Sequence, residues 1–122
     1  MPERGIYLFS EGGKYLYVGR TNRLRKRLSG HCSASSTHLT AAFAFLIARW
    51  ETNNLRPSYR KEGSRAMLME DEAFAASFHG AKQRISRMDI RFIEEPDPIK
   101  QTLLEVYVAV VLKTQFNNFE NH

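Results

Sequence analysis

The stretch GIYLFSEGGKYLYVGR, residues 5–20, predicts two short strands joined by a glycine-bearing connection. Aliphatic and aromatic side chains fill both halves, and Glu11-Gly12-Gly13 suits a hairpin that carries a bulge. A three-residue connection would set Tyr7 opposite Tyr17 and Phe9 opposite Tyr15. We expect this register because it separates an aromatic face, which holds both pairs, from an aliphatic face.

A basic helix is expected directly after the hairpin. Thr21-Asn22 offers an N-cap for a helix over residues 23–31, in which Arg27 and His31 share a stripe at i, i+4. Together with the two tyrosines of the hairpin, this helix would bring two phenols, a guanidinium and an imidazole into one short region. These groups would form about half of an active site for phosphodiester chemistry.

Length and composition favour one soluble domain spanning residues 1–122, with a long excursion at about 32–87. The chain has 122 residues and a single cysteine, Cys32, which cannot form an intramolecular disulfide. It contains no apolar run of the ~18 residues that a membrane span needs and no basic-then-apolar leader. We therefore expect a cytoplasmic protein in a reducing setting, with no membrane partner.

Positive charge is concentrated near the N-terminus. The formal net charge is +5, and six Lys or Arg residues but no acid lie between Lys14 and His31. Such a surface favours a polyanionic partner, although a solvated basic helix face is the simpler interpretation. The excursion adds a second basic cluster, which either contacts DNA or merely completes the fold. The predicted nucleic-acid contacts are Arg20, Arg23, Lys26, Arg56, Arg60 and Lys61.

The rest of the chain predicts further helices and one more strand. Helical spacing indicates a helix over about 38–52 and another within 67–87, which Gly80 could interrupt. Alternation predicts a third strand over 88–94. Asp97-Pro98 is a good N-cap and first-turn pair for a helix running to about 114. Because that helix is apolar nearly all round, we expect it to be the central buried element.

Glu105 is the only charged residue between Lys100 and Lys113. Most helical glutamates are simply solvated, and that reading stays open for Glu105 taken alone. A carboxylate on a buried helix beside a basic cleft is nevertheless the ligand that a hard divalent cation uses. Magnesium takes one or two carboxylates and completes its shell with water and phosphate oxygens.

These motifs, taken in order, resemble those of the GIY-YIG nuclease domain. The resemblance implies an α/β fold of the α+β type, with a small three-stranded antiparallel sheet flanked by helices. It also implies cleavage of DNA phosphodiesters with one divalent metal, Mg²⁺ or Mn²⁺. The matching residues are Gly5-Ile6-Tyr7, Tyr17-Val18-Gly19, Arg27, His31, Glu105 and Gln115-Phe116-Asn117.

By resemblance, Tyr7 is the general base or a phenol that orients the attacking water. A free tyrosine has a pKa of about 10, so a base would need a depressed pKa or a concerted proton transfer to a group such as His31. We expect the nearby Arg and Lys residues to depress the pKa of Tyr7. Ordinary aromatic packing for Tyr7, and a plain helix-end role for His31, are the competing interpretations.

The resemblance gives the remaining residues distinct roles. Tyr17 would contact the scissile phosphate or its solvent, and Arg27 would bind the phosphate. Glu105 would hold the metal, and Asn117 would buttress the site through hydrogen bonds. Tyr17 could instead be a packing residue and Arg27 a solvated charge, while Asn118 and Asn121 compete with Asn117 for its role.

The sequence thus predicts a divalent-metal-dependent DNA endonuclease that nicks one strand per site, as a monomer or weak dimer. One alternative is a non-catalytic nucleic-acid-binding module on the same scaffold. Another is an interaction domain recruited to a larger complex by unidentified protein partners.

Overall fold

The computed structural model describes residues 3–32, 41–52 and 68–117. These residues form two compact units, one from residues 3–28 and 88–117 and the other from residues 29–32, 41–52 and 68–87. The first unit contains a sheet and its covering helix, and the second contains two packed helices. The single-domain organisation stays a prediction.

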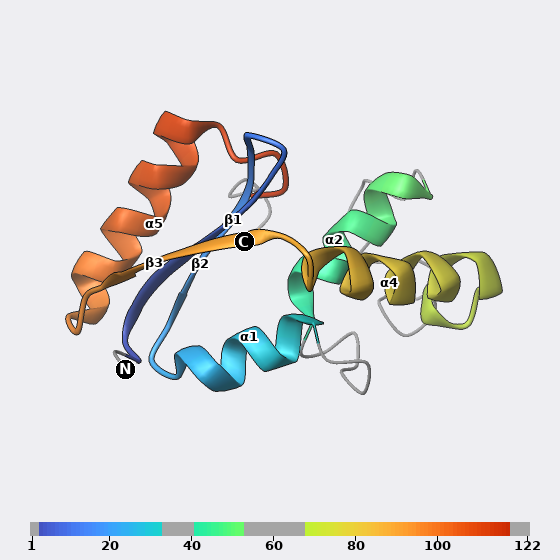
Figure 1. Cartoon of the computed structure of the whole chain (residues 1–122), viewed down its shortest axis with the longest axis horizontal. Helices are drawn as coiled ribbons and strands as arrows, with labels where there is room; N and C mark the ends of the chain where they lie inside the picture. The colour runs from blue at the N-terminus through green and yellow to red at the C-terminus, as the bar shows by residue number, and fades with distance from the viewer. Residues whose placement is uncertain (1–2, 33–40, 53–67, 118–122) are drawn as a thin grey trace. The chain divides into compact units, whose positions relative to one another are not determined.

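Three strands form one antiparallel sheet in the order β2-β1-β3 (Figure 1). The central strand is β1 (Gly5–Glu11), flanked by β2 (Lys14–Thr21) and β3 (Asp89–Glu94). The backbone of β1 is paired on both sides, and its residues from Gly5 to Ser10 are all buried. The predicted fold class, a small three-stranded antiparallel sheet flanked by helices, is confirmed.

The predicted register of the hairpin is wrong. Tyr7 pairs with Gly19 and Phe9 with Tyr17, and the pairing shifts between Phe9 and Ser10. The turn has only two residues, Gly12 and Gly13, whose φ angles of 58° and 81° lie in the left-handed region that glycine adopts without strain. A two-residue turn followed by a bulge therefore replaces the expected three-residue connection.

The bulge also changes which face the β2 side chains occupy. Beyond Tyr17, which pairs with Phe9, the next paired residue is Tyr15, opposite Ser10, so Leu16 is the extra residue. Tyr15 consequently packs with the cluster around Leu8, on the side of the sheet away from Tyr7. The prediction of one face holding all four aromatic residues of the hairpin is wrong at Tyr15.

The helix α5 (Pro98–Leu112) begins where the sequence predicted. The Asp97 carboxylate accepts hydrogen bonds from the backbone N–H groups of Ile99 and Lys100, at 2.8 and 3.2 Å, with Pro98 in the first turn. The helix ends at Lys113, whose φ of 53° is left-handed.

Among the described residues, no helix is long and apolar enough to cross a membrane.

One stripe of α5 covers the sheet and the opposite stripe does not. The buried cluster joins Ala109 to three residues of β1 and β2, and further apolar residues of α5 border it. Only Gln101 and Ala109 of α5 are buried. The prediction that α5 is the central buried element is therefore wrong. Its apolar residues lie on two faces of the helix, and the sheet covers only one of them. The cluster and its border comprise Ile6, Leu8, Val18, Ala109, Tyr15, Leu104, Val108 and Leu112.

In the second unit, α2 (Ala42–Glu51) packs against α4 (Glu72–Ile85). The Phe45 ring lies edge-on to Phe74, with a 5.2 Å separation between ring centroids. Asp71 caps α4, which continues through Gly80 without interruption. Both helices were expected from their spacing, while the flanking predictions over 33–40 and 53–67 lie outside the described residues.

Candidate active site

Tyr7 is held rigidly in the middle of the central strand. Its side chain is 1% exposed, and its ring lies over the backbone of Gly19. A Cβ atom at Gly19 would overlap the Tyr7 hydroxyl and ring, so only glycine fits opposite this tyrosine. Gly5 is required for a similar reason, because a Cβ atom there would overlap the backbone carbonyl of Ile93.

Arg27 reaches Tyr7 from α1 (Leu24–Cys32), the basic helix that follows the hairpin. Its Nε donates a hydrogen bond of 3.3 Å to the Tyr7 hydroxyl. Partial burial lowers the pKa of Arg27, but the phenols of Tyr7 and Tyr17 outweigh it and the pKa lies above its usual value. The guanidinium thus stays charged among two phenols, one of which, Tyr17, has its ring centroid 6.4 Å from that of Tyr7.

The pKa of Tyr7 is shifted opposite to the prediction. Burial raises this pKa well above its usual value, and Tyr17 adds to the effect. The charge of Arg27 and its hydrogen bond lower the pKa, but by less than burial raises it. The prediction considered only the nearby cations. Tyr7 is 1% exposed, so its phenol also loses contact with water, which raises the pKa.

Glu105 lies on α5, half-buried, and its charge further raises the pKa of Tyr7. Its carboxylate therefore belongs to the same electrostatic environment as the two phenols and Arg27. The described residues contain no group of three or more His, Cys, Asp or Glu side chains that could hold a metal. One half-buried carboxylate fits a hard divalent cation that keeps most of its water, and does not fit a closed structural site.

Asn117 clamps the edge strand of the sheet. Its Oδ1 accepts a hydrogen bond from the Val18 N–H and its Nδ2 donates one to the Val18 carbonyl, both at 2.8 Å. Phe116 N–H also donates to the Leu16 carbonyl at 2.9 Å, so this segment pairs along the edge of β2. Asn117 thereby holds the residue between Tyr17 and Gly19, while the competing Asn118 and Asn121 lie outside the described residues.

His31 belongs to the second unit, on the last turn of α1. It is fully buried, with its ring edge-on to Phe43 and a centroid separation of 6.4 Å. The first unit by itself brings together Tyr7, Tyr17, Arg27, Glu105 and Asn117. A proton transfer between Tyr7 and His31 stays a prediction.

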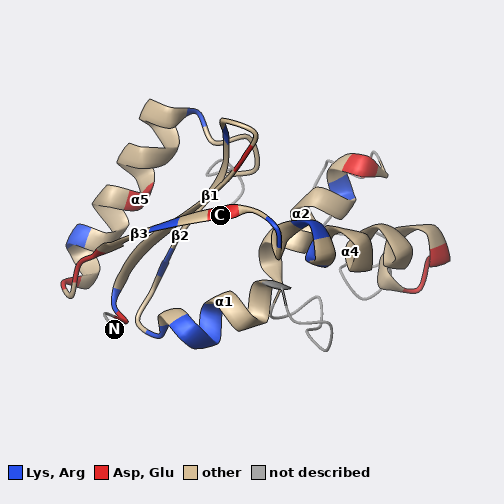
Figure 2. Cartoon of the chain, in the orientation of Figure 1, with Lys and Arg blue, Asp and Glu red and all other residues tan. Residues whose placement is uncertain are grey.

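Three of the predicted nucleic-acid contacts lie on the surface of the first unit. Arg20, Arg23 and Lys26 are exposed, and Figure 2 shows basic residues without acids on α1. The other three, Arg56, Arg60 and Lys61, lie outside the described residues.

Gln101 supports the site and was missed by the sequence analysis. It is fully buried, and its Nε2 donates to Asn22 Oδ1 at 3.1 Å and to the Glu95 carbonyl at 2.6 Å. This amide connects α5 to the segment that leads into α1, and so helps to position Arg27. An amide within an otherwise apolar helix was the signal that could have identified it.

Sequence comparison agrees with this fold. The model of the GIY-YIG catalytic domain matches residues 3–72, more than half of the chain. The chain therefore belongs to the GIY-YIG family, a family of phosphodiester hydrolases.

One curated relative is the UvrABC system protein C of Thermosipho africanus (strain TCF52B), which is 33% identical over 66 residues. The match covers 54% of this chain but only 11% of that protein. No solved structure matches the chain significantly.

Proposed function

We propose that this chain is a divalent-metal-dependent DNA endonuclease that cuts one strand per site. The observation that carries the proposal is the hydrogen bond from Arg27 Nε to the buried Tyr7 hydroxyl, beside Tyr17 and Glu105. A buried phenol, a fixed guanidinium and one carboxylate are the groups that phosphodiester hydrolysis needs. The exposed basic residues of α1 supply a surface for the DNA backbone.

Arg27 binds and polarises the scissile phosphate. A guanidinium has five N–H donors, more than its interactions with the two phenols use. The remaining donors can form a fork to phosphoryl oxygens, where negative charge grows during the reaction. Tyr7 and Tyr17 hold the guanidinium in place for this contact.

Tyr7 orients the attacking water as a neutral phenol. Its raised pKa keeps the proton on its oxygen near neutral pH. A phenol O–H is both a donor and an acceptor, so Tyr7 can orient a water through a hydrogen bond. Because the ring is fixed over Gly19, that water has a defined direction of approach.

Glu105 is the residue that would hold Mg²⁺ or Mn²⁺. A bound divalent cation would supply charge stabilisation at the phosphate and at the leaving oxygen. Asn117 acts as a positioning residue, since it holds the backbone next to Tyr17 without lying among the charged groups.

A non-catalytic nucleic-acid-binding module is the second candidate. The burial of Tyr7 favours it, because an almost fully enclosed ring in the central strand is also what ordinary cross-strand packing produces. The two functions differ in turnover and in metal dependence.

Cleavage of supercoiled plasmid with Mg²⁺, with Mn²⁺ and with EDTA tests the proposal. We expect metal-dependent nicking that falls by about 10²–10³-fold in Arg27→Ala and by at least about 10²-fold in Tyr7→Phe. Glu105→Ala should abolish the response to metal. Matched controls remove the same residue types from exposed positions and should nick normally: Tyr107→Phe, Arg87→Ala and Glu94→Ala.

Two results would overturn the proposal. If the folded parent leaves plasmid, branched DNA and single-stranded DNA intact but binds them with a steep salt dependence, the chain is a binding module. If linear plasmid forms without a nicked intermediate at a concentration where sedimentation shows only the monomer, the assignment of one cut per site is wrong.

A further inference from the structure

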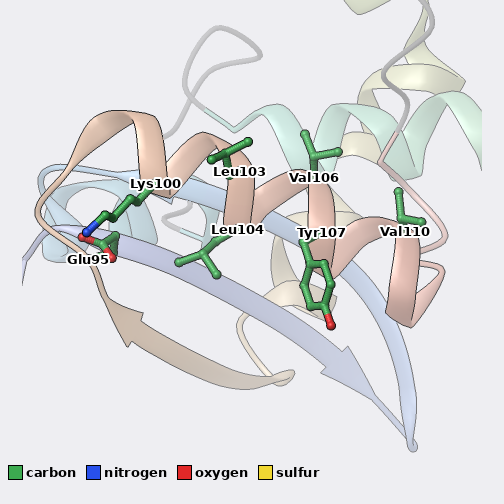
Figure 3. Close-up of a pocket in the computed structure, with 7 residues that line it drawn as sticks. All are labelled: Glu95, Lys100, Leu103, Leu104, Val106, Tyr107 and Val110. Atoms are coloured by element: carbon green, nitrogen blue, oxygen red, sulfur yellow. The ribbon is translucent and has the colours of Figure 1, made fainter.

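The outer face of α5 is apolar and exposed to solvent. Exposed fractions there range from 40% at Val106 to 72% at Ile99. Figure 3 shows part of this face, with Lys100 and Glu95 at one end of an open groove of about 770 Å³. We define the α5 outer face by its six exposed apolar residues: Ile99, Leu103, Val106, Tyr107, Val110 and Val111.

This face is as large as the largest apolar patches on typical monomers. With about 100 Å² exposed by each of its side chains, it covers roughly 600 Å², the upper end of the largest apolar patch on typical monomers. If two such faces meet, they bury about 1,200 Å², the lower limit for a specific protein interface. The area therefore reaches the size at which specific interfaces begin.

The spacing of the apolar residues along this face is the same when it is followed from either end of α5. Its central seam consists of Ile99, Leu103, Val106 and Val110, at intervals of four, three and four residues, which is the repeat of a coiled-coil seam. At 3.6 residues per turn, the seam lies opposite Val108, which borders the core. An antiparallel second copy would place Ile99 against Val110 and Leu103 against Val106. One helix thus offers both halves of a two-fold interface.

The charges at the ends of the helix favour the antiparallel arrangement. In that register, exposed Lys113 approaches Glu95 and Asp97 of the second copy. Lys100 approaches the carboxyl-terminal half of the other helix, where the helix dipole is negative. In a parallel arrangement, Lys100 would instead face Lys100 of the other copy. Lys113 would then no longer approach the acidic residues, and Lys100 would no longer approach the carboxyl end of the other helix.

We propose that two copies of this chain associate through the α5 outer face, antiparallel, with Ile99 of each copy against Val110 of the other. Glu105 does not belong to the seam, so association leaves the candidate active site accessible. The proposal concerns binding alone and does not depend on nuclease activity.

The mass in solution tests this association. At about 100 µM, sedimentation should give twice the 14.1 kDa of the chain. Leu103→Glu should give the monomer mass, because it buries an unpaired carboxylate at the centre of the seam. Its control, Gln83→Glu, adds the same charge at an exposed position of α4 and should stay dimeric. Circular dichroism checks that both variants are folded.

A charge-pairing experiment tests the orientation. Ile99→Glu and Val110→Lys should each be monomeric when purified alone, and a mixture of the two should form a heterodimer. In a parallel pair, each substituted residue would instead face the native residue at the same position of the other copy. The new Glu and Lys would then not meet, so the mixture would not form a dimer. The proposal is overturned if the parent stays monomeric up to about 1 mM, if Leu103→Glu keeps the dimer mass, or if the mixture stays monomeric. A monomeric parent would mean that another part of a longer protein, or a different protein, covers this face.

Discussion

Asn117→Ala is expected to lower the free energy of unfolding by about 2 kcal/mol. The substitution removes both 2.8 Å hydrogen bonds between the amide and the Val18 backbone, each worth about 0.5–1.5 kcal/mol net. Both hydrogen bonds lie at the part-buried edge of β2, so together they account for about 2 kcal/mol. At about 4 °C per kcal/mol for a chain of this size, Tm should fall by about 8 °C.

Urea unfolding followed by far-UV circular dichroism measures this change directly. Asn117→Asp is a useful second variant, because it keeps the acceptor for the Val18 N–H but sets a carboxylate against the Val18 carbonyl. It should lose at least as much stability as Asn117→Ala. Gln115→Ala is the control, since its side chain is exposed and its backbone N–H still donates to Tyr15.

The same variants separate a positioning role from a purely structural one. At a temperature where Asn117→Ala is fully folded, plasmid nicking should still be reduced, because Tyr17 and Gly19 flank the residue that the amide holds. If Asn117→Ala unfolds within about 0.5 kcal/mol of the parent, the amide clamp contributes nothing in solution. The reasoning about the edge of β2 would then be refuted.

Three further predictions concern the surroundings of Tyr7. Gly19→Ala should cost about 1–3 kcal/mol in urea unfolding, because its Cβ would overlap the buried Tyr7 ring. Gly80→Ala is the control: it has open space for the Cβ and lies within α4, so it should stabilise the chain by about 0.5–1 kcal/mol. Above pH ~10 the unfolded chain loses the Tyr7 proton that the folded chain keeps, so the free energy of unfolding should fall more steeply with pH in the parent than in Tyr7→Phe. Between about pH 6 and 9, the ratio of parent to Tyr7→Phe nicking rates should stay constant; a tenfold rise per pH unit would indicate an ionised phenol instead.

Local patterns in the sequence predicted the elements of the fold well. Asp97-Pro98 marked the start of α5, and alternation located β3, because capping and pleat depend on residues close in the chain. The register of the hairpin was missed because two glycines with positive φ shorten the turn and Leu16 is then left over. Residue spacing does not reveal such a combination of a turn and a bulge.

For the candidate site, the sequence predicted which side chains lie near one another better than it predicted their electrostatics. Tyr7, Arg27 and Glu105 do share one environment in the first unit. The sign of the Tyr7 pKa shift was wrong, because desolvation depends on packing that no count of charges contains. For α5, an apolar sequence indicated burial but could not say which of its faces the sheet would cover.

The burial that fixes Tyr7 and the shift of its pKa have a single cause. The Tyr7 ring, which belongs to the central strand, is held over Gly19 and cannot turn toward solvent. The same burial raises the free energy of the ionised phenol. The orientation of the Tyr7 ring and the pKa of its phenol therefore cannot be changed independently. Arg27 offsets part of the penalty while staying charged itself, so it is the group through which a bound phosphate would act on the phenol. A tyrosine enclosed in this way suits the proposed role of a neutral phenol that orients water better than the role of a free base.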